Sequence, residues 1–185
     1  MKKVLFLNAS PTVGGNGDTL IAAAMEAATA CGAEVQCVNI REKHINFCQA
    51  CYGCSQTGVC VQQDDFRDIL ALIHEADAVI ADAPIYYNCM AAQMITLINR
   101  LCCTFAYRDY KLGPKKKVGV MLTCTGSEVE EMKRHVRNIT VLPSVARTIR
   151  GEMIEVFTEC NSNDSCSNSA EYLETARQIA KWACE

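Results

Sequence analysis

Two nearly continuous apolar runs, residues 77–83 and 117–122, constrain the fold more strongly than any other feature of the sequence. Strands that are apolar throughout are typical of parallel sheets whose two faces are both covered by helices. Other strands are predicted from β-branched or alternating runs, and helices from apolar residues at helical spacing. The predicted strands are 3–8, 34–40 and 152–157, and the predicted helices are 19–30, 65–75, 90–102, 128–138 and 170–184. Because strands alternate with helices, the sequence predicts an α/β protein with right-handed crossovers.

Length and charge narrow the class of protein. The 185 residues suffice for one domain with a sizeable core, so a single domain over residues 1–185 is expected. The formal net charge of -3 provides no basic field for nucleic acid or an anionic membrane. The apolar run after Met1 breaks at Asn8 and Pro11, too early for a signal peptide, and no stretch is long enough to span a bilayer. We therefore expect a cytoplasmic protein with no nucleic-acid or membrane partner.

Three segments, residues 9–19, 84–89 and 123–127, follow predicted strands at the end of the sheet where α/β proteins bind ligands. The first offers hydroxyls, an amide and glycines before a helix, which suits a phosphate group. It contains no Lys or Arg, and it lacks both the triphosphate-binding and the dinucleotide-binding glycine motifs. A phosphate monoester fits best, although the same residues are typical of a flexible connection. The candidate ligand-binding residues are Ser10, Thr12, Asn16, Gly17, Asp18 and Thr19, and Asp18 is also the expected N-cap of the helix.

The second and third segments complement the first. Two tyrosines directly after a buried strand favour contact with a flat ring, and the alternative is that they cover the sheet edge. The third segment again offers hydroxyls and a glycine turn without charge. The candidate residues are Pro84, Ile85, Tyr86, Tyr87, Asn88, Thr123, Thr125, Gly126 and Ser127. No segment is specific alone, but the three together indicate one ligand site.

These motifs resemble those of the NADPH-dependent FMN reductase family of flavodoxin-like proteins, and within it the iron-sulfur flavoproteins. The family's Ser-Pro-x-x-x-Gly-Asn-Ser/Thr phosphate loop is matched by Ser10, Pro11, Gly15 and Asn16. Its Pro-x-Tyr flavin loop is matched by residues 84–86. The resemblance runs from residue 3 to about 127 and is weak thereafter.

The resemblance implies a flavodoxin-like three-layer sandwich with a five-stranded parallel sheet of order 2-1-3-4-5 and a cysteine-rich insertion at 44–63 after strand 2. It also implies bound FMN. The phosphate would lie among Ser10, Thr12, Asn16 and Thr19, and the isoalloxazine ring between residues 84–88 and 123–127. Gly17 stands where the family usually has Ser or Thr, which removes a hydroxyl donor. Thr12 replaces the common Arg of Ser-Pro-Arg, so the contacts of that arginine are absent.

Four cysteines of the insertion, Cys48, Cys51, Cys54 and Cys60, form the sharpest local motif. Two-residue gaps turn successive thiolates toward one centre, and the longer last gap returns a fourth ligand. A 4Fe-4S cluster is the leading interpretation, and its spacing matches the iron-sulfur flavoproteins. The alternatives are zinc, a thiol-disulfide pair or an empty motif.

The remaining cysteines carry weaker signals, and without an export signal they are expected to be reduced thiols or metal ligands. Cys89 and Cys124 fall in the candidate flavin segments, where packing is the expected role. Cys160 and Cys166 could pair or bind metal, but a chance occurrence in a polar loop is the favoured interpretation.

The expected function is that of an FMN-dependent oxidoreductase in which the cofactor carries the redox chemistry and no side chain acts as a catalytic acid or base. In the leading hypothesis, FMN and the cluster pass electrons between a low-potential donor and an acceptor, each a small molecule or a carrier protein. The alternatives are a cluster-free NAD(P)H-dependent reductase of FMN or quinone, and a cysteine-rich metal-binding module without flavin. The resemblance also implies NAD(P)H as a donor, and a homodimer or homotetramer with the insertion near a neighbour's flavin.

Overall fold

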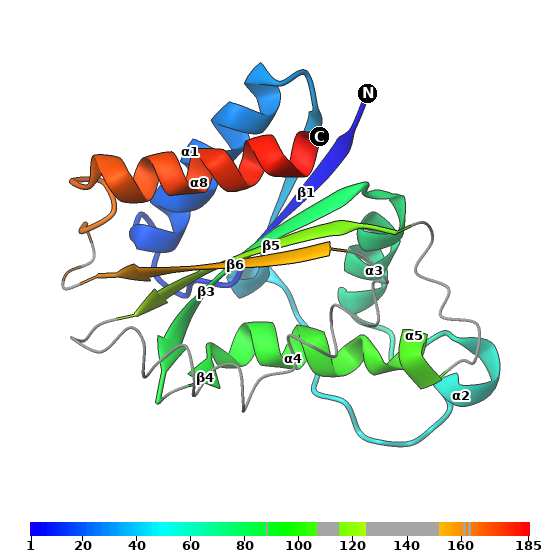
Figure 1. Ribbon diagram of the computed structural model, residues 1–185. Helices are drawn as coiled ribbons and strands as arrows, with labels where there is room; N and C mark the ends of the chain where they lie inside the picture. Colours follow the sequence, from blue (N-terminus) through cyan, green and yellow to red (C-terminus); the bar gives the residue numbers. More distant parts are fainter. Residues whose placement is uncertain (88, 107–114, 125–151, 161, 163) are drawn as a thin grey trace.

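The computed structural model describes residues 1–87, 89–106, 115–124, 152–160, 162 and 164–185. Five strands form its central parallel sheet, in the order β2-β1-β3-β5-β6 (Figure 1). They are β1 (Lys3–Asn8), β2 (Glu34–Asn39), β3 (Ala78–Tyr86), β5 (Lys117–Cys124) and β6 (Glu152–Glu159). Each neighbouring pair is parallel. Without the short β4, this is the order 2-1-3-4-5 along the chain, which confirms the expected flavodoxin-like α/β fold.

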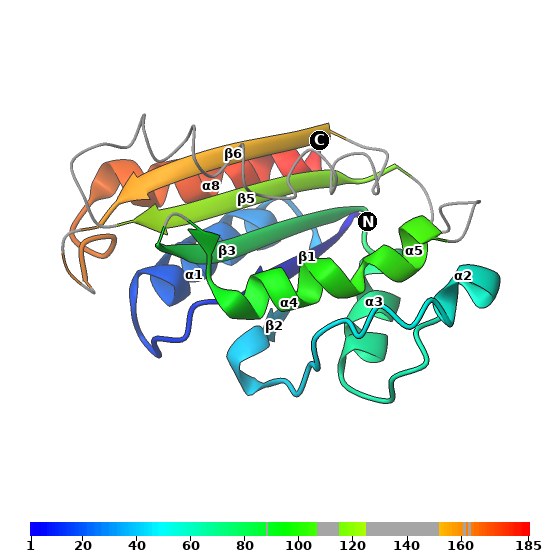
Figure 2. The ribbon, with the colours of Figure 1, turned by 90° about the horizontal axis from the view of Figure 1, so that it is seen from below.

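Helices cover both faces of the sheet, as Figures 1 and 2 show. The pair α1 (Asn16–Ala30) and α8 (Ala170–Cys184) packs on one face. The other face carries α3 (Phe66–Glu75), α4 (Ala92–Arg100) and α5 (Cys102–Ala106). The connection after β2 contains the 3-10 helix η1 (Ile40–Glu42) and the short α2 (Cys54–Thr57). Within the described residues, no helix is long and apolar enough to cross a membrane.

Alternate side chains of the strands enter two separate cores, as the pleat of a strand requires. Phe6 and Ile80 pack in the core under α1 and α8, together with Ile179. Leu7 and Ala81 pack in the opposite core. Because both faces are covered, residues 77–83 read as a nearly unbroken apolar run. Its two exceptions are Asp77, which directly precedes β3, and Asp82, a carboxyl side chain that is fully buried in β3.

The end of β3 differs from the sequence prediction. The predicted strand ended at residue 83, but β3 continues through Pro84 and Ile85 to Tyr86. It then turns back into the two-residue strand β4 (Cys89–Met90), where Ile85 pairs with Met90 and Tyr86 with Cys89. Proline cannot donate a backbone hydrogen bond, but its carbonyl accepts one from the amide of Ala91 at 2.8 Å. The expected flavin loop is therefore a strand end and a tight hairpin.

The first helix also starts earlier than predicted. Helix α1 begins at Asn16 with Gly15 at its N-cap, so the prediction that Asp18 is the N-cap was wrong. The Asp18 carboxylate instead lies in the first turn, where it accepts a hydrogen bond from the amide of Gly14 at 2.7 Å. A negative charge in the first turn is stabilised by the helix dipole. The helix predicted over 90–102 is divided into α4 and α5, and the one over 128–138 lies outside the described residues.

Candidate functional site

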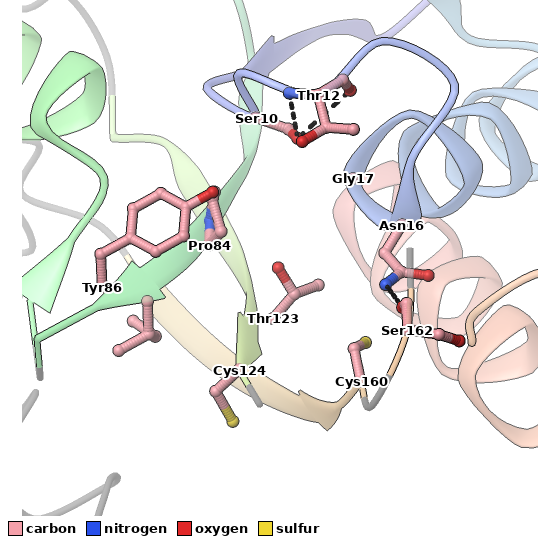
Figure 3. A pocket seen from close by; sticks show the side chains of 11 residues that line it. Ser10, Thr12, Asn16, Gly17, Pro84, Tyr86, Thr123, Cys124, Cys160 and Ser162 are labelled. Atoms are coloured by element: carbon pink, nitrogen blue, oxygen red, sulfur yellow. Dashed lines mark hydrogen bonds between the residues drawn. The ribbon is translucent and has the colours of Figure 1, made fainter. Parts of the chain in front are cut away.

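A cavity of about 190 Å³ opens at the carboxyl ends of β1, β3 and β5 (Figure 3). It is bordered by the loop after β1, the start of α1, the ends of β3 and β5, and the segment after β6. Its described lining residues are Ser10, Thr12, Asn16, Gly17, Pro84, Ile85, Tyr86, Thr123, Cys124, Cys160 and Ser162. The structure thus brings together parts of all three predicted ligand segments. Parallel strands cause this, because their carboxyl ends meet at one edge of the sheet.

Other residues of the predicted site lie elsewhere. Asp18 and Thr19 do not line the cavity, and the Thr19 hydroxyl donates a hydrogen bond to the carbonyl of Gly15 at 3.1 Å. Tyr87 is fully exposed, with a positive φ of 49°. Asn88, Thr125, Gly126 and Ser127 lie outside the described residues.

Arg41 fixes the loop after β1. Its Nη1 donates to Asp18 Oδ1 at 2.8 Å and to the carbonyl of Ser10 at 3.2 Å. Burial raises the pKa of Asp18, but hydrogen bonds from Arg41, the Gly14 amide and Asn8 outweigh it and hold that pKa below its usual value. Asp18 is therefore an ionised partner of Arg41 and shapes the loop. Sequence reasoning missed Arg41 because a single arginine in η1 belongs to no motif.

The N-terminus of α1 supplies the polar end of the cavity. Ser10 and Thr12 fold the loop locally, with the Thr12 amide donating to Ser10 Oγ at 3.3 Å. At Asn16 and Gly17, helix α1 opens on the cavity, and the first N–H groups of a helix have no acceptor within it. The helix dipole adds a partial positive charge. An anion here would meet hydroxyls and amides, while no described lining residue is basic.

The side chain of Asn16 ties the helix to the segment after β6. Its Nδ2 donates to the carbonyl of Ser162 at 2.6 Å (Figure 3), and its Oδ1 accepts from the amide of Cys166 at 2.8 Å. Asn16 was expected to contact a phosphate. In the structure both ends of its amide form hydrogen bonds within the protein, which position Ser162 and Cys166, and the contact with a phosphate stays a prediction.

Asp82 explains the glycine at position 17. Neither carboxyl oxygen of Asp82 has a hydrogen-bond partner within the described structure. A Cβ atom on residue 17 would overlap Asp82 Oδ2 and lie 2.7 Å from Ser10 Cβ, so Ser or Thr does not fit there. Burial, and then the charges of Cys160 and Asp18, raise the pKa of Asp82 to about 8. At pH 7 the carboxyl is therefore mostly protonated and adds little negative charge beside the N-terminus of α1.

Three thiols lie at the floor of the same site. Cys160 and Cys124 line the cavity, and Cys166 is buried behind Cys160. The sulfurs of Cys160 and Cys166 are 3.4 Å apart, and Cys124 Sγ donates to the carbonyl of Thr158 at 3.7 Å. The sequence favoured a chance occurrence of Cys160 and Cys166 in a polar loop, but the structure buries both and places them in contact.

The cysteine insertion lies at the far end of α4 from the cavity, beside α5 (Figure 2). Cys51 is exposed, and Cys48, Cys54 and Cys60 are partly buried. Burial and then the charges of Cys60, Cys51 and Cys48 raise the pKa of Cys54, because the four thiols are neighbours. The donor set fits a thiolate-bound cluster. Within the described part of the chain, however, no three His, Cys, Asp or Glu side chains are arranged to hold a metal ion.

A buried ion pair anchors this insertion to α4. Arg100 Nη1 lies 2.6 Å from Asp64 Oδ2, and its Nη2 lies 3.0 Å from Oδ1, with both side chains fully buried. The guanidinium also donates to the carbonyl of Asn46 at 2.8 Å and to Cys60 Sγ at 3.3 Å. It stacks on the ring of Phe66 with 4.6 Å to the centroid. Arg100 thus holds the last cysteine of the motif in place.

Comparison with known proteins finds one family model and relatives that share a single name. A family model described as NADPH-dependent FMN reductase matches residues 2–155. An iron-sulfur flavoprotein of Archaeoglobus fulgidus is 42% identical over 101 residues, which are 55% of this chain and 46% of that protein. One of Methanocaldococcus jannaschii is 33% identical over 189 residues, covering 99% of this chain and 96% of that protein. The match therefore spans about half the length of the first relative and nearly all of the second.

Solved structures of low sequence identity share the fold. An NAD(P)H:quinone oxidoreductase from Methanothermobacter marburgensis superposes with a TM-score of 0.76 at 17% identity, covering 97% of this chain and 94% of that chain. An azoreductase from Bacillus anthracis str. Sterne gives a TM-score of 0.65 at 18% identity, covering 100% and 99%. At these identities the likeness concerns the fold alone.

Proposed function

The chain belongs to the NADPH-dependent FMN reductase family of flavin-dependent oxidoreductases, on its iron-sulfur flavoprotein branch, and we propose that it binds FMN in the cavity at the carboxyl ends of β1, β3 and β5. One observation carries this proposal. A single cavity is lined by parts of the three strand-end segments, and no Lys, Arg, Asp or Glu occurs among its described lining residues. A site of hydroxyls and backbone amides suits a phosphate monoester linked to a flat ring.

Each part of the cavity has a role toward FMN. The start of α1, with the hydroxyls of Ser10 and Thr12, binds the phosphate, and Gly17 lets the backbone approach it above the protonated Asp82. Pro84 to Tyr86 and Thr123 border the ring. Bound FMN supplies the redox chemistry, accepting a hydride or single electrons. The protein orients the ring and shields it, and no side chain need act as a catalytic acid or base.

The same proposal assigns a 4Fe-4S cluster to Cys48, Cys51, Cys54 and Cys60, which would hold it by their thiolates; the cluster would supply single-electron exchange with a donor and an acceptor. Two observations support it: the four neighbouring thiols, and the curated relatives that are named iron-sulfur flavoproteins. Arg100 assists by donating a hydrogen bond to Cys60 Sγ, which fixes the position of that sulfur. NAD(P)H as a donor, a small molecule or carrier protein as partner, a cytoplasmic location and a homodimer or homotetramer belong to the same proposal.

A second candidate is a cluster-free NAD(P)H-dependent reductase of FMN or quinone. The specific observation in its favour is that the four thiols, although neighbours, are not arranged as metal ligands in the described structure. In this case the insertion is a surface loop held by Arg100 and Asp64.

Anaerobic purification with joint quantification of FMN and iron tests the proposal. We expect one FMN per chain and about four irons, with an absorbance beyond the flavin bands that reductant bleaches. Cys51→Ser should lose the iron and keep the FMN, while Cys31→Ser, an exposed cysteine at the end of α1, should keep both. FMN without iron in the wild-type protein would favour the second candidate. Failure to bind FMN would overturn the flavin assignment itself.

A further inference from the structure

The thiols of Cys160 and Cys166 form a pair beside the proposed flavin site. Their sulfurs are 3.4 Å apart, a contact distance that must shorten to about 2 Å for a disulfide bond. The two residues are separated by only five others and both are buried, with 3% and 0% of their surfaces exposed. Cys160 lines the cavity, so one sulfur of the pair faces the space assigned to the flavin.

Backbone and side-chain hydrogen bonds hold the pair in this position. The amide of Cys160 donates to the carbonyl of Cys124 at 2.6 Å, and the amide of Cys166 donates to Asn16 Oδ1 at 2.8 Å. Each cysteine is therefore tied to a different wall of the cavity, one to β5 and the other to α1. Such anchoring keeps the sulfurs in contact without a covalent bond.

The surroundings of the pair suit thiol chemistry. The hydrogen bond with Cys166 lowers the pKa of Cys160 to about 7 despite its burial, and it raises that of Cys166. A thiolate is the reactive form of cysteine. The carboxyl of Asp82, which has no hydrogen-bond partner among the described residues, lies near both thiols, since the charge of Cys160 affects Asp82 and that of Asp82 affects Cys166. The Asp82 carboxyl is thus placed to accept a proton from these thiols or to donate one to them.

From this geometry we propose that Cys160 and Cys166 are a dithiol–disulfide redox site that exchanges two electrons with the flavin in the adjacent cavity. Oxidation joins the two sulfurs in one S–S bond and releases two electrons and two protons. The electrons and protons reduce oxidised FMN, and reduced FMN returns them when it breaks the disulfide. The proposal rests on the proposed function only in naming FMN as the electron partner.

The sequence permits a direct measurement of the pair. Trypsin cleavage after Arg150 and Arg177 gives a peptide, residues 151–177, whose only cysteines are Cys160 and Cys166. Treatment of the whole protein with glutathione disulfide, followed by alkylation and mass spectrometry, should yield this peptide without alkyl groups and two hydrogens lighter. Subsequent anaerobic reduction of the bound FMN should restore both alkylation sites at least about tenfold faster than in FMN-free protein. A disulfide between Cys160 and Cys124, or full alkylation after oxidation, would overturn the assignment.

A reductive titration gives a second readout. Wild-type protein pre-oxidised with glutathione disulfide should require two electrons per FMN more than Cys166→Ala, while the control Cys37→Ser, a partly buried cysteine of β2 outside the cavity, should match the wild type. The peptide measurement uses wild-type protein, so it stands even where Cys166→Ala fails to fold. If the protein binds one FMN per chain but Cys160 and Cys166 never form a disulfide, this inference is wrong and the proposed function still stands. A pair that oxidises in a protein that binds no FMN would overturn both the flavin link and the proposed function.

Discussion

At the scale of single residues, Gly17 and Asp82 form a matched pair. The side chain of Asp82 occupies the space that a Cβ at residue 17 would need. We expect Gly17→Ala to lower the free energy of unfolding by about 1–3 kcal/mol, as overpacking of a core usually does. In an Asp82→Ala background the same change should cost less, because the overlap with the carboxyl is removed and only the close contact with Ser10 Cβ remains. Urea denaturation of the four proteins in this double-mutant cycle measures the coupling. An equal cost in both backgrounds would show that the two positions are independent.

Asp82 also makes stability depend on pH. Its pKa is about 8 in the folded protein, against 3.8 for an ordinary aspartate, so the folded state binds the extra proton between these values. Stability should therefore fall as pH rises from 5 to 8, by about 1.4 kcal/mol per pH unit from this group. His74 and Cys160, whose folded pKa values are lowered, act in the opposite direction. The difference between wild type and Asp82→Asn in urea denaturation isolates the slope, and parallel profiles would contradict it.

Sequence reasoning reached the cavity residues that follow strands in recognisable motifs, such as Ser10, Pro84 and Thr123. It missed Asp82, although a carboxyl inside an apolar run was itself a signal of a special environment. It also did not place Cys160 and Ser162 in the site. These residues follow the last strand, and only the pairing of β6 with β5 brings them to the cavity.

At the scale of elements, the contact between α4 and the cysteine insertion depends on the ion pair of Arg100 and Asp64. Removing Arg100 leaves Asp64 buried without its partner, which typically costs about 3–5 kcal/mol. We expect Arg100→Met to destabilise the protein by that order in urea denaturation and to speed alkylation of Cys60, which loses its hydrogen-bond donor. The matched control is Arg177→Met on α8, whose contact with Glu174 is 3.8 Å long and exposed and should contribute less than about 1 kcal/mol. Equal effects of the two changes would refute the anchoring role.

The same scale shows where element prediction succeeds. The two helical layers followed from the continuous apolar runs, because both faces of the sheet had to be covered, and the strand order followed from the family resemblance. The boundaries at β3 and α1 did not follow, since Pro84 continues the strand through its carbonyl and Asp18 interacts with the loop from inside the helix. The end of β3 and the start of α1 depend on contacts with residues such as Ala91 and Arg41, which local sequence patterns do not reveal.

At the scale of the whole molecule, the proposed FMN cavity and the proposed cluster site lie at opposite ends of α4 (Figure 2). The nine residues of α4 span about 14 Å at 1.5 Å per residue, and the insertion lies beyond it, beside α5. Electron transfer slows steeply with distance, so a shorter path would speed exchange between FMN and the cluster. A homo-oligomer in which the insertion of one chain meets the cavity of another would shorten the path, in agreement with the assembly that the family resemblance implied.

Subunit complementation tests this arrangement. Cys51→Ser protein that holds FMN but no cluster, and wild-type protein stripped of FMN with its iron retained, should each fail to pass electrons from FMN to iron. Mixing them under conditions of subunit exchange should restore bleaching of the iron-sulfur absorbance, because each mixed assembly holds both groups on neighbouring chains. Light scattering should find a dimer or tetramer, and dilution below its dissociation constant should abolish the restored transfer. A wild-type monomer that transfers electrons at the undiluted rate would instead require a path within one chain, past the full length of α4.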